Sequence, residues 1–498
     1  MKPEVTIARQ AGISMAGFAF GQLARFGYNL AAARLLGAEA LGVYALVVAV
    51  VQVGEVVATA GLDASLLRFA NLHDGDERRR VVASAMKMVA ISALVVSALL
   101  FLLSDSIAAA LHGGRLLSLT IRSAAAAIPL SVATQVAGHA IQAFRRLAPK
   151  VVATQIVAPV ALLALMVGAR YLSGVEAALL FPFVPSALLA LAWIVPGFRK
   201  STGVGSGEIL RAPVDRAMLN VALPLLAVSL FGMFSHWIDI MMLGLLTDPR
   251  TVGLYHPAAR TAGLLRSVFL AFSGIAAPMF AACHARGDNE GIRRLYELVS
   301  RWVLTIVLLP ALLLSAFPRE ALAIFGDGFQ AGATALVLLS VSALLQVWFG
   351  FGSTVLAMAG GERLSLVNQA VALLLQVCLH LLLIPRYGLN GAALSTLIVT
   401  ALLSATRAIE MRLLLGIPLL SPKAWKPLLA ASVTGAALFI SRPLLEPLPV
   451  PQLLAAGAAG ATLLYVLLIR MFRLEQEELE VIFSIMPFLN KHSTNDIT

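Results

Sequence analysis

The chain has 498 residues, of which 59% are apolar and only 13% are charged. Soluble domains carry about 25% charged and about 45–50% apolar residues, so this composition excludes a soluble globular protein and makes lipid the main solvent. The formal net charge of +11 comes from basic residues in short loops between apolar runs, which is typical of membrane orientation and argues against a nucleic-acid partner. The two cysteines, Cys283 and Cys378, have no ligand spacing around them, so no metal site is predicted.

Apolar runs of about 20 residues, the length of a helix that crosses a bilayer, recur along the whole sequence. They predict an all-α polytopic membrane protein with about fourteen transmembrane helices. The predicted spans are residues 11–33, 41–61, 81–103, 117–142, 151–169, 175–197, 218–246, 252–281, 302–318, 331–358, 365–385, 389–406, 424–441 and 452–469.

The loop Lys and Arg residues gather on one side of this layout when the N-terminus is placed in the cytoplasm. The opposite loops hold Arg34, Arg115, Arg170, Arg250, Arg319, Arg386 and Arg442. A miscounted helix would invert every later loop and destroy this bias. We therefore expect a multi-pass protein of the cytoplasmic (inner) membrane with both termini in the cytoplasm.

The sequence repeats itself with an offset of about 211 residues. Gly42 and Tyr44, for example, are echoed by Gly253 and Tyr255. Each copy holds an even number of spans, so the copies are predicted to be parallel lobes suited to alternating access. The expected domains are an N-terminal six-helix lobe (1–197), a flexible cytoplasmic linker (198–217), a C-terminal six-helix lobe (218–412), two additional helices (413–471) and a cytoplasmic tail (472–498).

Ionisable and amide side chains at bilayer depth are the candidate functional residues, because each needs a partner or water there. Gln22, Arg25 and Asn29 share one helical face by their i, i+3, i+7 spacing. The remaining candidates are Glu55 in the second span, His236 and Asp239 in the seventh, and Arg260 and Arg266 in the eighth.

Two roles fit these residues. In the functional interpretation, Arg25, Arg260 and Arg266, with Gln22 and Asn29, bind the phosphates of an anionic substrate in a central cavity. Glu55, Asp239 and His236 are then counter-charges or coupling groups. In the structural alternative, Arg25–Glu55 and Asp239–Arg266 are pairs that fix helix register, or the arginines extend to the membrane interface.

Motifs of an energy-consuming enzyme are missing from the sequence. It contains no G-x-x-x-x-G-K-[ST] loop, no H-E-x-x-H and no G-x-S-x-G. We therefore expect a transporter and not an enzyme, without a cofactor, and with coupling to H⁺ or Na⁺ left open.

Several segments resemble the polysaccharide-export, or O-antigen flippase, branch of the multidrug/oligosaccharidyl-lipid/polysaccharide exporter (MOP) superfamily. They are Ala33-Arg34-Leu35-Leu36-Gly37, Gly42-Val43-Tyr44, Gly61-Leu62, Leu67-Arg68-Phe69, Asp239-Ile240-Met241-Met242-Leu243-Gly244, Gly253-Leu254-Tyr255 and Leu383-Ile384-Pro385-Arg386-Tyr387-Gly388-Leu389-Asn390-Gly391-Ala392-Ala393. The resemblance implies two six-helix lobes in a V shape around a central cavity, with two extra helices. It also implies flipping of a polyprenyl-pyrophosphate-linked oligosaccharide from the cytoplasmic to the outer leaflet during surface polysaccharide biosynthesis.

Arginines in the first and eighth helices of related peptidoglycan-precursor flippases are similar to Arg25, Arg260 and Arg266. The resemblance leaves a cation-coupled multidrug exporter of the same superfamily open, and Glu55 and Asp239 alone do not exclude it. A membrane-embedded glycan polymerase or ligase is a third alternative, although no long outer loop is predicted. The expected partners are the bilayer and the lipid-linked glycan, with a polysaccharide polymerase and glycosyltransferases as further candidates.

Overall fold

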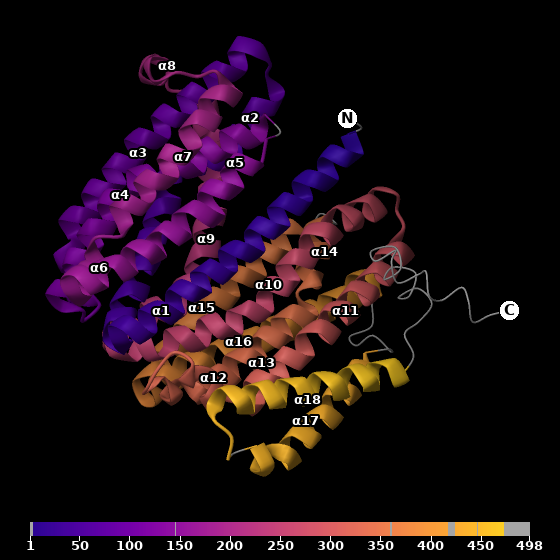
Figure 1. The fold of residues 1–498 in the computed structure, drawn as a ribbon. Helices are drawn as coiled ribbons and strands as arrows, with labels where there is room; N and C mark the ends of the chain where they lie inside the picture. Colours follow the sequence, from indigo (N-terminus) through magenta and orange to yellow (C-terminus); the bar gives the residue numbers. More distant parts are fainter. Residues whose placement is uncertain (1–2, 145, 359–360, 417–423, 446, 473–498) are drawn as a thin grey trace. The chain divides into compact units, whose positions relative to one another are not determined.

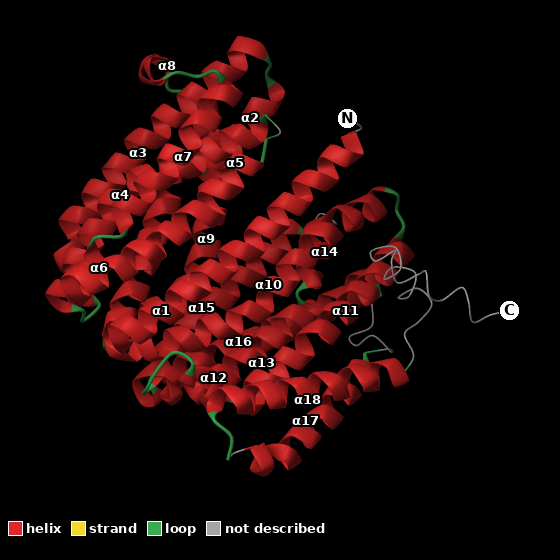
Figure 2. Cartoon of the chain, in the orientation of Figure 1, coloured by secondary structure: helices red, strands yellow, loops and turns green. Residues whose placement is uncertain are grey.

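A computed structural model describes residues 3–144, 146–358, 361–416, 424–445 and 447–472 of the chain. Within these residues every regular element is a helix, and no strand is formed (Figure 2). The elements are α1 (Pro3–Thr59), α2 (Leu62–Leu72), α3 (Gly75–Ala110), α4 (Gly114–Ala143), α5 (Ala148–Val151), η1 (Val152–Val157), α6 (Ala158–Leu180), α7 (Phe183–Thr202), α8 (Ser206–Arg211), α9 (Arg216–Leu246), α10 (Pro249–Ala285), α11 (Asn289–Ala316), α12 (Pro318–Ala323), η2 (Phe329–Gly332), α13 (Ala333–Phe349), α14 (Phe351–Met358), α15 (Glu362–Tyr387), α16 (Leu389–Leu415), α17 (Trp425–Leu445) and α18 (Val450–Met471).

Thirteen segments of the described residues are long and apolar enough to cross a membrane. The first of them, Ala16–Leu72, covers both the first and the second predicted spans. Within α1 the backbone breaks at Gly37, which has φ 84° and ψ 178°. Glycine tolerates this conformation at little cost, so α1 consists of two helical arms joined at Gly37. The all-α polytopic prediction is confirmed, and the break accounts for the difference from about fourteen spans.

The elements α5, η1 and α6 form one helical segment that contains a π turn and runs without interruption from Ala148 to a backbone break at Gly174. The ring of a proline in a helix clashes with the carbonyl four residues earlier and offers it no N–H donor. Pro159 stands in this relation to Gln155, and the turn before it widens to the π-helix η1 (Val152–Val157). Such single π turns are rare and occur frequently at functional sites.

Aspartates begin the two helices that follow the linker. Asp215 accepts hydrogen bonds from the backbone N–H groups of Ala217 and Met218 at 2.9 and 3.2 Å and caps α9. Asp248 accepts bonds from the backbone and hydroxyl of Thr251 at 2.9 and 3.0 Å, ahead of Pro249 at the first position of α10. Slight burial raises the pKa of Asp248, but the hydrogen bonds from Thr251 outweigh burial and hold this pKa below its usual value.

Two glycines allow the second arm of α1 to cross α10 in direct backbone contact. A Cβ on Gly42 would overlap the carbonyl oxygen of Pro249 and lie 2.9 Å from the backbone nitrogen of Gly253. A Cβ on Gly253 would overlap the carbonyl oxygen of Ala38 and lie 3.0 Å from the backbone nitrogen of Gly42. The contact is reciprocal, and its members are the glycines of the sequence echo.

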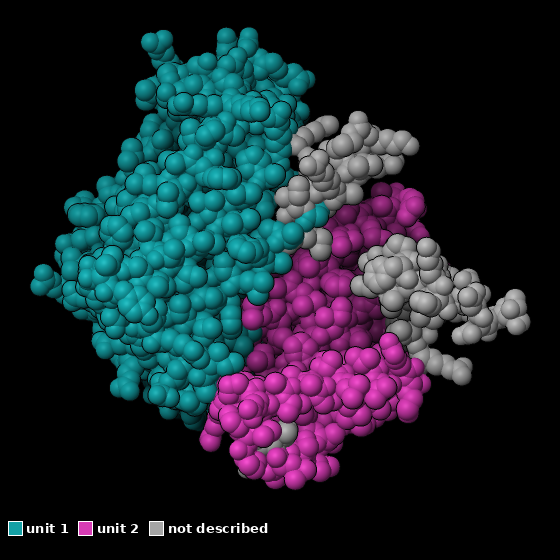
Figure 3. All heavy atoms as spheres, in the orientation of Figure 1, with its two compact units in different colours: residues 1–261, 322–339, 366–400 teal, residues 262–321, 340–365, 401–498 magenta. Residues whose placement is uncertain are grey.

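The chain forms two compact units, shown in different colours in Figure 3. Unit 1 is Met1–Thr261, Leu322–Leu339 and Leu366–Thr400, and unit 2 is Ala262–Ala321, Ser340–Ser365 and Ala401–Thr498. These bounds differ from those of the two lobes that the repeat predicts. The lobe division therefore stays a prediction.

The core of unit 1 is built around α4, which packs against α1, α3 and α7 (Figure 1). Fully buried apolar side chains of these helices and of α2 and α9, among them Leu66, Val82 and Ile128, form one cluster. In unit 2, α11 packs against α14, α17 and α18. The two predicted additional helices are thus present as α17 and α18, whereas residues 473–498 of the predicted tail lie outside the described residues.

The linker between α7 and α9 contains the short helix α8 and is bonded to α3. The side chain of Arg79 donates to the carbonyl of Gly203, and Lys87 Nζ donates to the carbonyl of Ala212 at 2.8 Å. Ser84 donates to the carbonyl of Pro213 at 2.7 Å. A segment expected to be flexible is therefore held against the N-terminal helices by three side chains of α3.

Candidate functional site

Arg25, on the first arm of α1, is held by neutral amide groups. Its Nε and Nη2 donate to Gln22 Oε1 at 3.2 and 3.1 Å, and Nη2 also donates to Gln155 Oε1 at 2.9 Å. Gln155 comes from the π turn η1. Amide oxygens satisfy the N–H donors without neutralising the guanidinium, so Arg25 keeps its charge available for an anion.

Asn29 links Arg25 to α10. Asn29 Nδ2 donates to the Arg25 carbonyl at 2.7 Å, and His256 Nε2 donates to Asn29 Oδ1 at 2.8 Å. His256 is fully buried, and its Nδ1 has no hydrogen-bond partner among the described residues. We call Gln22, Arg25, Asn29, Gln155 and His256 the Arg25 site.

Arg260 lies one helical turn after His256 on α10, over an aromatic ring. Its guanidinium carbon is 4.5 Å from the centroid of Trp237, and Trp237 Nε1 donates to Gln52 Oε1 at 3.0 Å. Both Arg25 and Arg260 interact electrostatically with buried Tyr44. The charges of both arginines therefore act on the same tyrosine, and the ring of Trp237 is a neutral partner of Arg260.

A second polar group surrounds Asp239 on α9. Asp239 Oδ2 accepts from the hydroxyls of Tyr255 at 2.8 Å and Thr396 at 3.0 Å, and Oδ1 accepts from Gln376 Nε2 at 2.7 Å. His380 Nε2 lies 3.5 Å from Oδ1, and its ring is fully buried. We call these five residues the Asp239 cluster. A carboxylate beside a histidine in a buried, hydrogen-bonded setting is suited to exchange a proton or a cation.

Glu55 occupies a third position, on the second arm of α1 facing α4. It accepts hydrogen bonds from the hydroxyl of Ser131 and from Gln135 Nε2, the latter at 3.2 Å. The partners of Arg25 and Glu55 are therefore amides and a hydroxyl, and the Arg25–Glu55 pair of the structural alternative is not formed.

His236 and Arg266 are the remaining predicted residues. His236 is exposed, with its ring against that of Trp237 at 5.2 Å between centroids. Arg266 belongs to unit 2, whereas Asp239 belongs to unit 1 and is bonded within it. The structure thus brings together Gln22, Arg25 and Asn29 through hydrogen bonds, and both Arg25 and Arg260 interact electrostatically with Tyr44.

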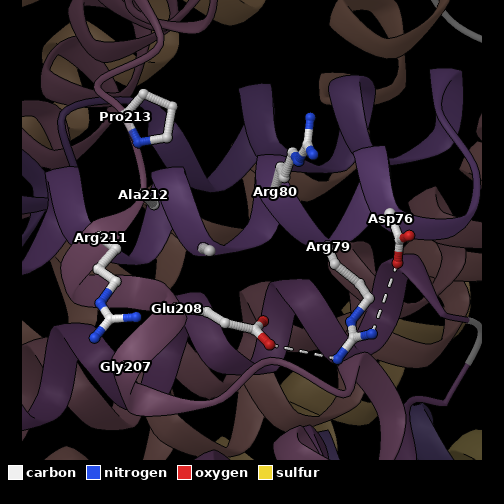
Figure 4. A pocket seen from close by; sticks show the side chains of 9 residues that line it. Asp76, Arg79, Arg80, Gly207, Glu208, Arg211, Ala212 and Pro213 are labelled. Atoms are coloured by element: carbon white, nitrogen blue, oxygen red, sulfur yellow. Dashed lines mark ion pairs between the residues drawn. The ribbon is translucent and has the colours of Figure 1, made fainter.

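Two cavities of unit 1 are lined by other residues. One, of about 400 Å³, is lined by apolar side chains of α1, α3 and α9, such as Val53, Leu100 and Met241. The other, of about 570 Å³, lies between the start of α3 and the linker helix α8, where Arg79 contacts both Asp76 and Glu208 (Figure 4). None of the eight predicted site residues lines either cavity. Within the described residues, no three His, Cys, Asp or Glu side chains could hold a metal ion.

Five residues of these groups are not among the candidates predicted from the sequence: Gln155, His256, Tyr44, Gln376 and His380. The signal available for Gln155 was an amide at membrane depth four residues before a proline. For His380 and Gln376 it was their i, i+4 spacing, which places them on one face of α15. That they face Asp239 depends on tertiary packing.

Comparisons with known proteins agree with the fold. The chain is 24% identical over 375 residues to the "Probable low-salt glycan biosynthesis flippase Agl15" of Haloferax volcanii, covering 73% of this chain and 75% of the relative. The structure is similar to that of the lipid II flippase MurJ in an inward closed conformation, with a TM-score of 0.75, 11% identity and coverage of 92% of this chain and 98% of that one.

An inward-facing multidrug resistance MATE family transporter of the MOP superfamily is also similar, with a TM-score of 0.67, 16% identity and coverage of 79% and 94%. These relatives are named as flippases and transporters, not enzymes, and the resemblance inferred from the sequence is confirmed. The model of the family described as polysaccharide biosynthesis protein matches residues 7–284, more than half of the chain. The chain therefore belongs to the polysaccharide biosynthesis protein family and is a multi-pass membrane protein with the fold of the MOP superfamily.

Proposed function

We propose that this protein flips a polyprenyl-pyrophosphate-linked oligosaccharide from the cytoplasmic to the outer leaflet during surface polysaccharide biosynthesis. The observation that carries the proposal is Arg25, an arginine inside a membrane-spanning helix whose hydrogen-bond partners are neutral amides. A pyrophosphate would supply the negative charge that the amide partners of Arg25 do not carry. Arg260, which like Arg25 interacts electrostatically with Tyr44, is the second cationic contact for the substrate. The similarity to a glycan biosynthesis flippase supports the substrate class.

Transport follows alternating access of two parallel lobes, residues 1–197 and 218–412, with the lipid tail remaining in the bilayer. The Lys and Arg distribution supports cytoplasmic termini in the inner membrane. The Asp239 cluster is the coupling site for H⁺ or Na⁺, and Glu55 is a second candidate. Polysaccharide polymerase and glycosyltransferases are proposed partners because they make and consume the substrate.

Cation-coupled multidrug export is the second candidate function. The Asp239 cluster favours it, because an acidic group with a histidine beside it is suited to cation exchange, and the likeness to MATE transporters in fold is compatible with it. The two functions differ in their dependence on Arg25. An anionic substrate needs this arginine, whereas a cationic drug does not.

The experiment is a flipping assay with the full-length protein in liposomes that contain a fluorescent polyprenyl-pyrophosphate sugar. We expect Arg25→Ala to abolish flipping while membrane insertion and thermal stability are retained. Arg122→Ala is the matched control, because Arg122 is neutralised by Asp105 at 2.6 Å and should keep full activity. A fully active Arg25→Ala protein would remove Arg25 from the mechanism, and export of a cationic drug by it would favour the second function.

A further inference from the structure

The π turn η1 places a neutral side chain where an acidic one would cancel the charge of Arg25. Gln155 Oε1 accepts from Arg25 Nη2 at 2.9 Å across 130 residues of sequence. The other acceptor, Gln22 Oε1, is also an amide oxygen. A guanidinium held in position by two amides is fixed in direction but keeps its full positive charge.

Local sequence explains why Gln155 reaches Arg25. Pro159 deprives the Gln155 carbonyl of its usual i+4 donor, and the chain makes a six-residue π turn at this point. On the opposite helix, Gly17 and Gly21 remove the side chains that would block the approach. A Cβ on Gly17 would overlap Val151 Cγ1, and a Cβ on Gly21 would overlap Gln155 Oε1. Small residues spaced in this way let helices approach closely in membranes.

Glutamate has the same shape as glutamine and would make a shorter, charge-assisted bond to Arg25. The resulting buried ion pair would hold Arg25 at least as well but would compete with any incoming anion. Arg122 shows such a pairing at an exposed position of this chain, since its guanidinium lies 2.6 Å from Asp105. The amide at position 155 is therefore suited to ligand binding rather than to structural pairing.

We propose that Gln155 is a specificity-determining residue of the Arg25 site, which holds the guanidinium through a neutral oxygen and so reserves its charge for the pyrophosphate of the lipid-linked substrate. This inference rests on the proposed function. It adds a residue of η1 to a site whose other members come from α1 and α10.

The test compares three variants of the full-length protein in liposomes: Gln155→Glu, Gln155→Met and, as a matched control, Gln142→Glu. Gln142 accepts a hydrogen bond from Lys150 at 2.8 Å, so this control adds the same charge beside a different cation. Affinity is measured for a polyprenyl pyrophosphate and for the corresponding uncharged polyprenol. A general disturbance of the fold would lower both affinities, whereas a charge effect lowers only the first.

We expect Gln155→Glu to weaken pyrophosphate binding and slow flipping by on the order of tenfold or more, because a buried like charge opposes the anion. Affinity for the polyprenol should not change. Gln155→Met removes the neutral acceptor without adding charge, so it should weaken pyrophosphate binding by less than Gln155→Glu does. Gln142→Glu should stay within about threefold of the parent, because it adds no charge beside Arg25. An equal loss for both lipids, or an unchanged Gln155→Glu protein, would overturn the inference. If Arg25→Ala is inactive while Gln155→Glu is active, the proposed function stands and only the role of Gln155 is lost.

Discussion

Two tyrosine-containing contacts in unit 1 occupy equivalent positions of the sequence repeat and differ in chemistry. In the first half, the rings of Tyr28 and Tyr44 lie 4.6 Å apart between centroids. In the second half, 211 residues later, the Tyr255 hydroxyl donates to Asp239 Oδ2 at 2.8 Å. Tyr28 and Tyr44 lie on the two arms of α1, and Asp239 and Tyr255 lie on α9 and α10. Equivalent pairs of consecutive helices therefore carry an aromatic contact in the first half and a carboxylate in the second.

The two contacts also differ in the charge of the groups near them. Arg25 and Arg260 both interact electrostatically with Tyr44 of the aromatic contact. Gln376 and His380 lie beside the carboxylate, in the proposed coupling site. Adjacent residues of α10 reach both groups, because Tyr255 contacts Asp239 and His256 contacts Asn29. A shift of α10 would therefore change the two sites together.

The largest expected effect comes from removing the charge that distinguishes the second half. We expect Asp239→Asn to lower gradient-driven flipping by on the order of 100-fold, because a neutral amide cannot exchange a proton or bind a cation. Flipping is measured in liposomes with an imposed H⁺ or Na⁺ gradient. Binding of the lipid-linked pyrophosphate should persist, since the Arg25 site is intact, but it should no longer depend on H⁺ or Na⁺.

Tyr28→Phe is the matched control for Asp239→Asn, because it alters the equivalent position of the first half and keeps the aromatic contact. Its gradient-driven flipping should stay within about threefold of the parent. A comparable loss in both variants would show that transport requires the contact between the two helices and not the carboxylate itself.

The next largest effect concerns the reciprocal backbone contact. We expect Gly42→Ala and Gly253→Ala to destabilise the protein by similar amounts, about 1–3 kcal/mol each, because each added methyl overlaps a carbonyl of the other helix. The measurement is the midpoint of thermal unfolding of the purified protein. Equal effects would show that both glycines serve the same crossing of α1 and α10, whereas a large effect at one glycine alone would contradict it.

Each glycine has a control on its own helix. A Cβ on Gly27 of α1 or on Gly274 of α10 would meet nothing within 4 Å. Alanine at either position should leave stability unchanged or raise it by up to about 1 kcal/mol, because alanine restricts the unfolded chain.

The membrane spans and the position of the polar residues within them can largely be predicted from the sequence. Apolar runs fix the spans because lipid admits no unpaired backbone, and the i, i+3, i+7 spacing of Gln22, Arg25 and Asn29 predicts their shared face. The break at Gly37 within a continuous α1 does not follow, because a short polar segment between spans fits a loop equally well. The π turn is likewise a tertiary outcome, although Pro159 marks its place.

The partners of the charged residues are less predictable than their positions. The sequence does not determine which helix Glu55 faces. Only the packing of the helices places it beside Ser131 and Gln135 on α4 and not beside Arg25. For Asp239, the helices that supply Gln376 and Thr396 lie about 140–160 residues later, beyond the reach of local periodicity.

The smallest expected effect comes from the contact that joins the two groups through α10. His256→Leu removes the donor to Asn29 Oδ1, but it also removes the buried Nδ1 that has no partner among the described residues. The loss of one bond and the relief of one unsatisfied group oppose each other, so we expect a net loss of about 1 kcal/mol in stability. Thermal unfolding measures it, and Asn29→Leu with the double variant shows whether the two effects are non-additive. If His256 links the groups, His256→Leu also weakens the dependence of pyrophosphate affinity on H⁺ or Na⁺, and an unaltered dependence would mean that α10 does not couple them through this residue.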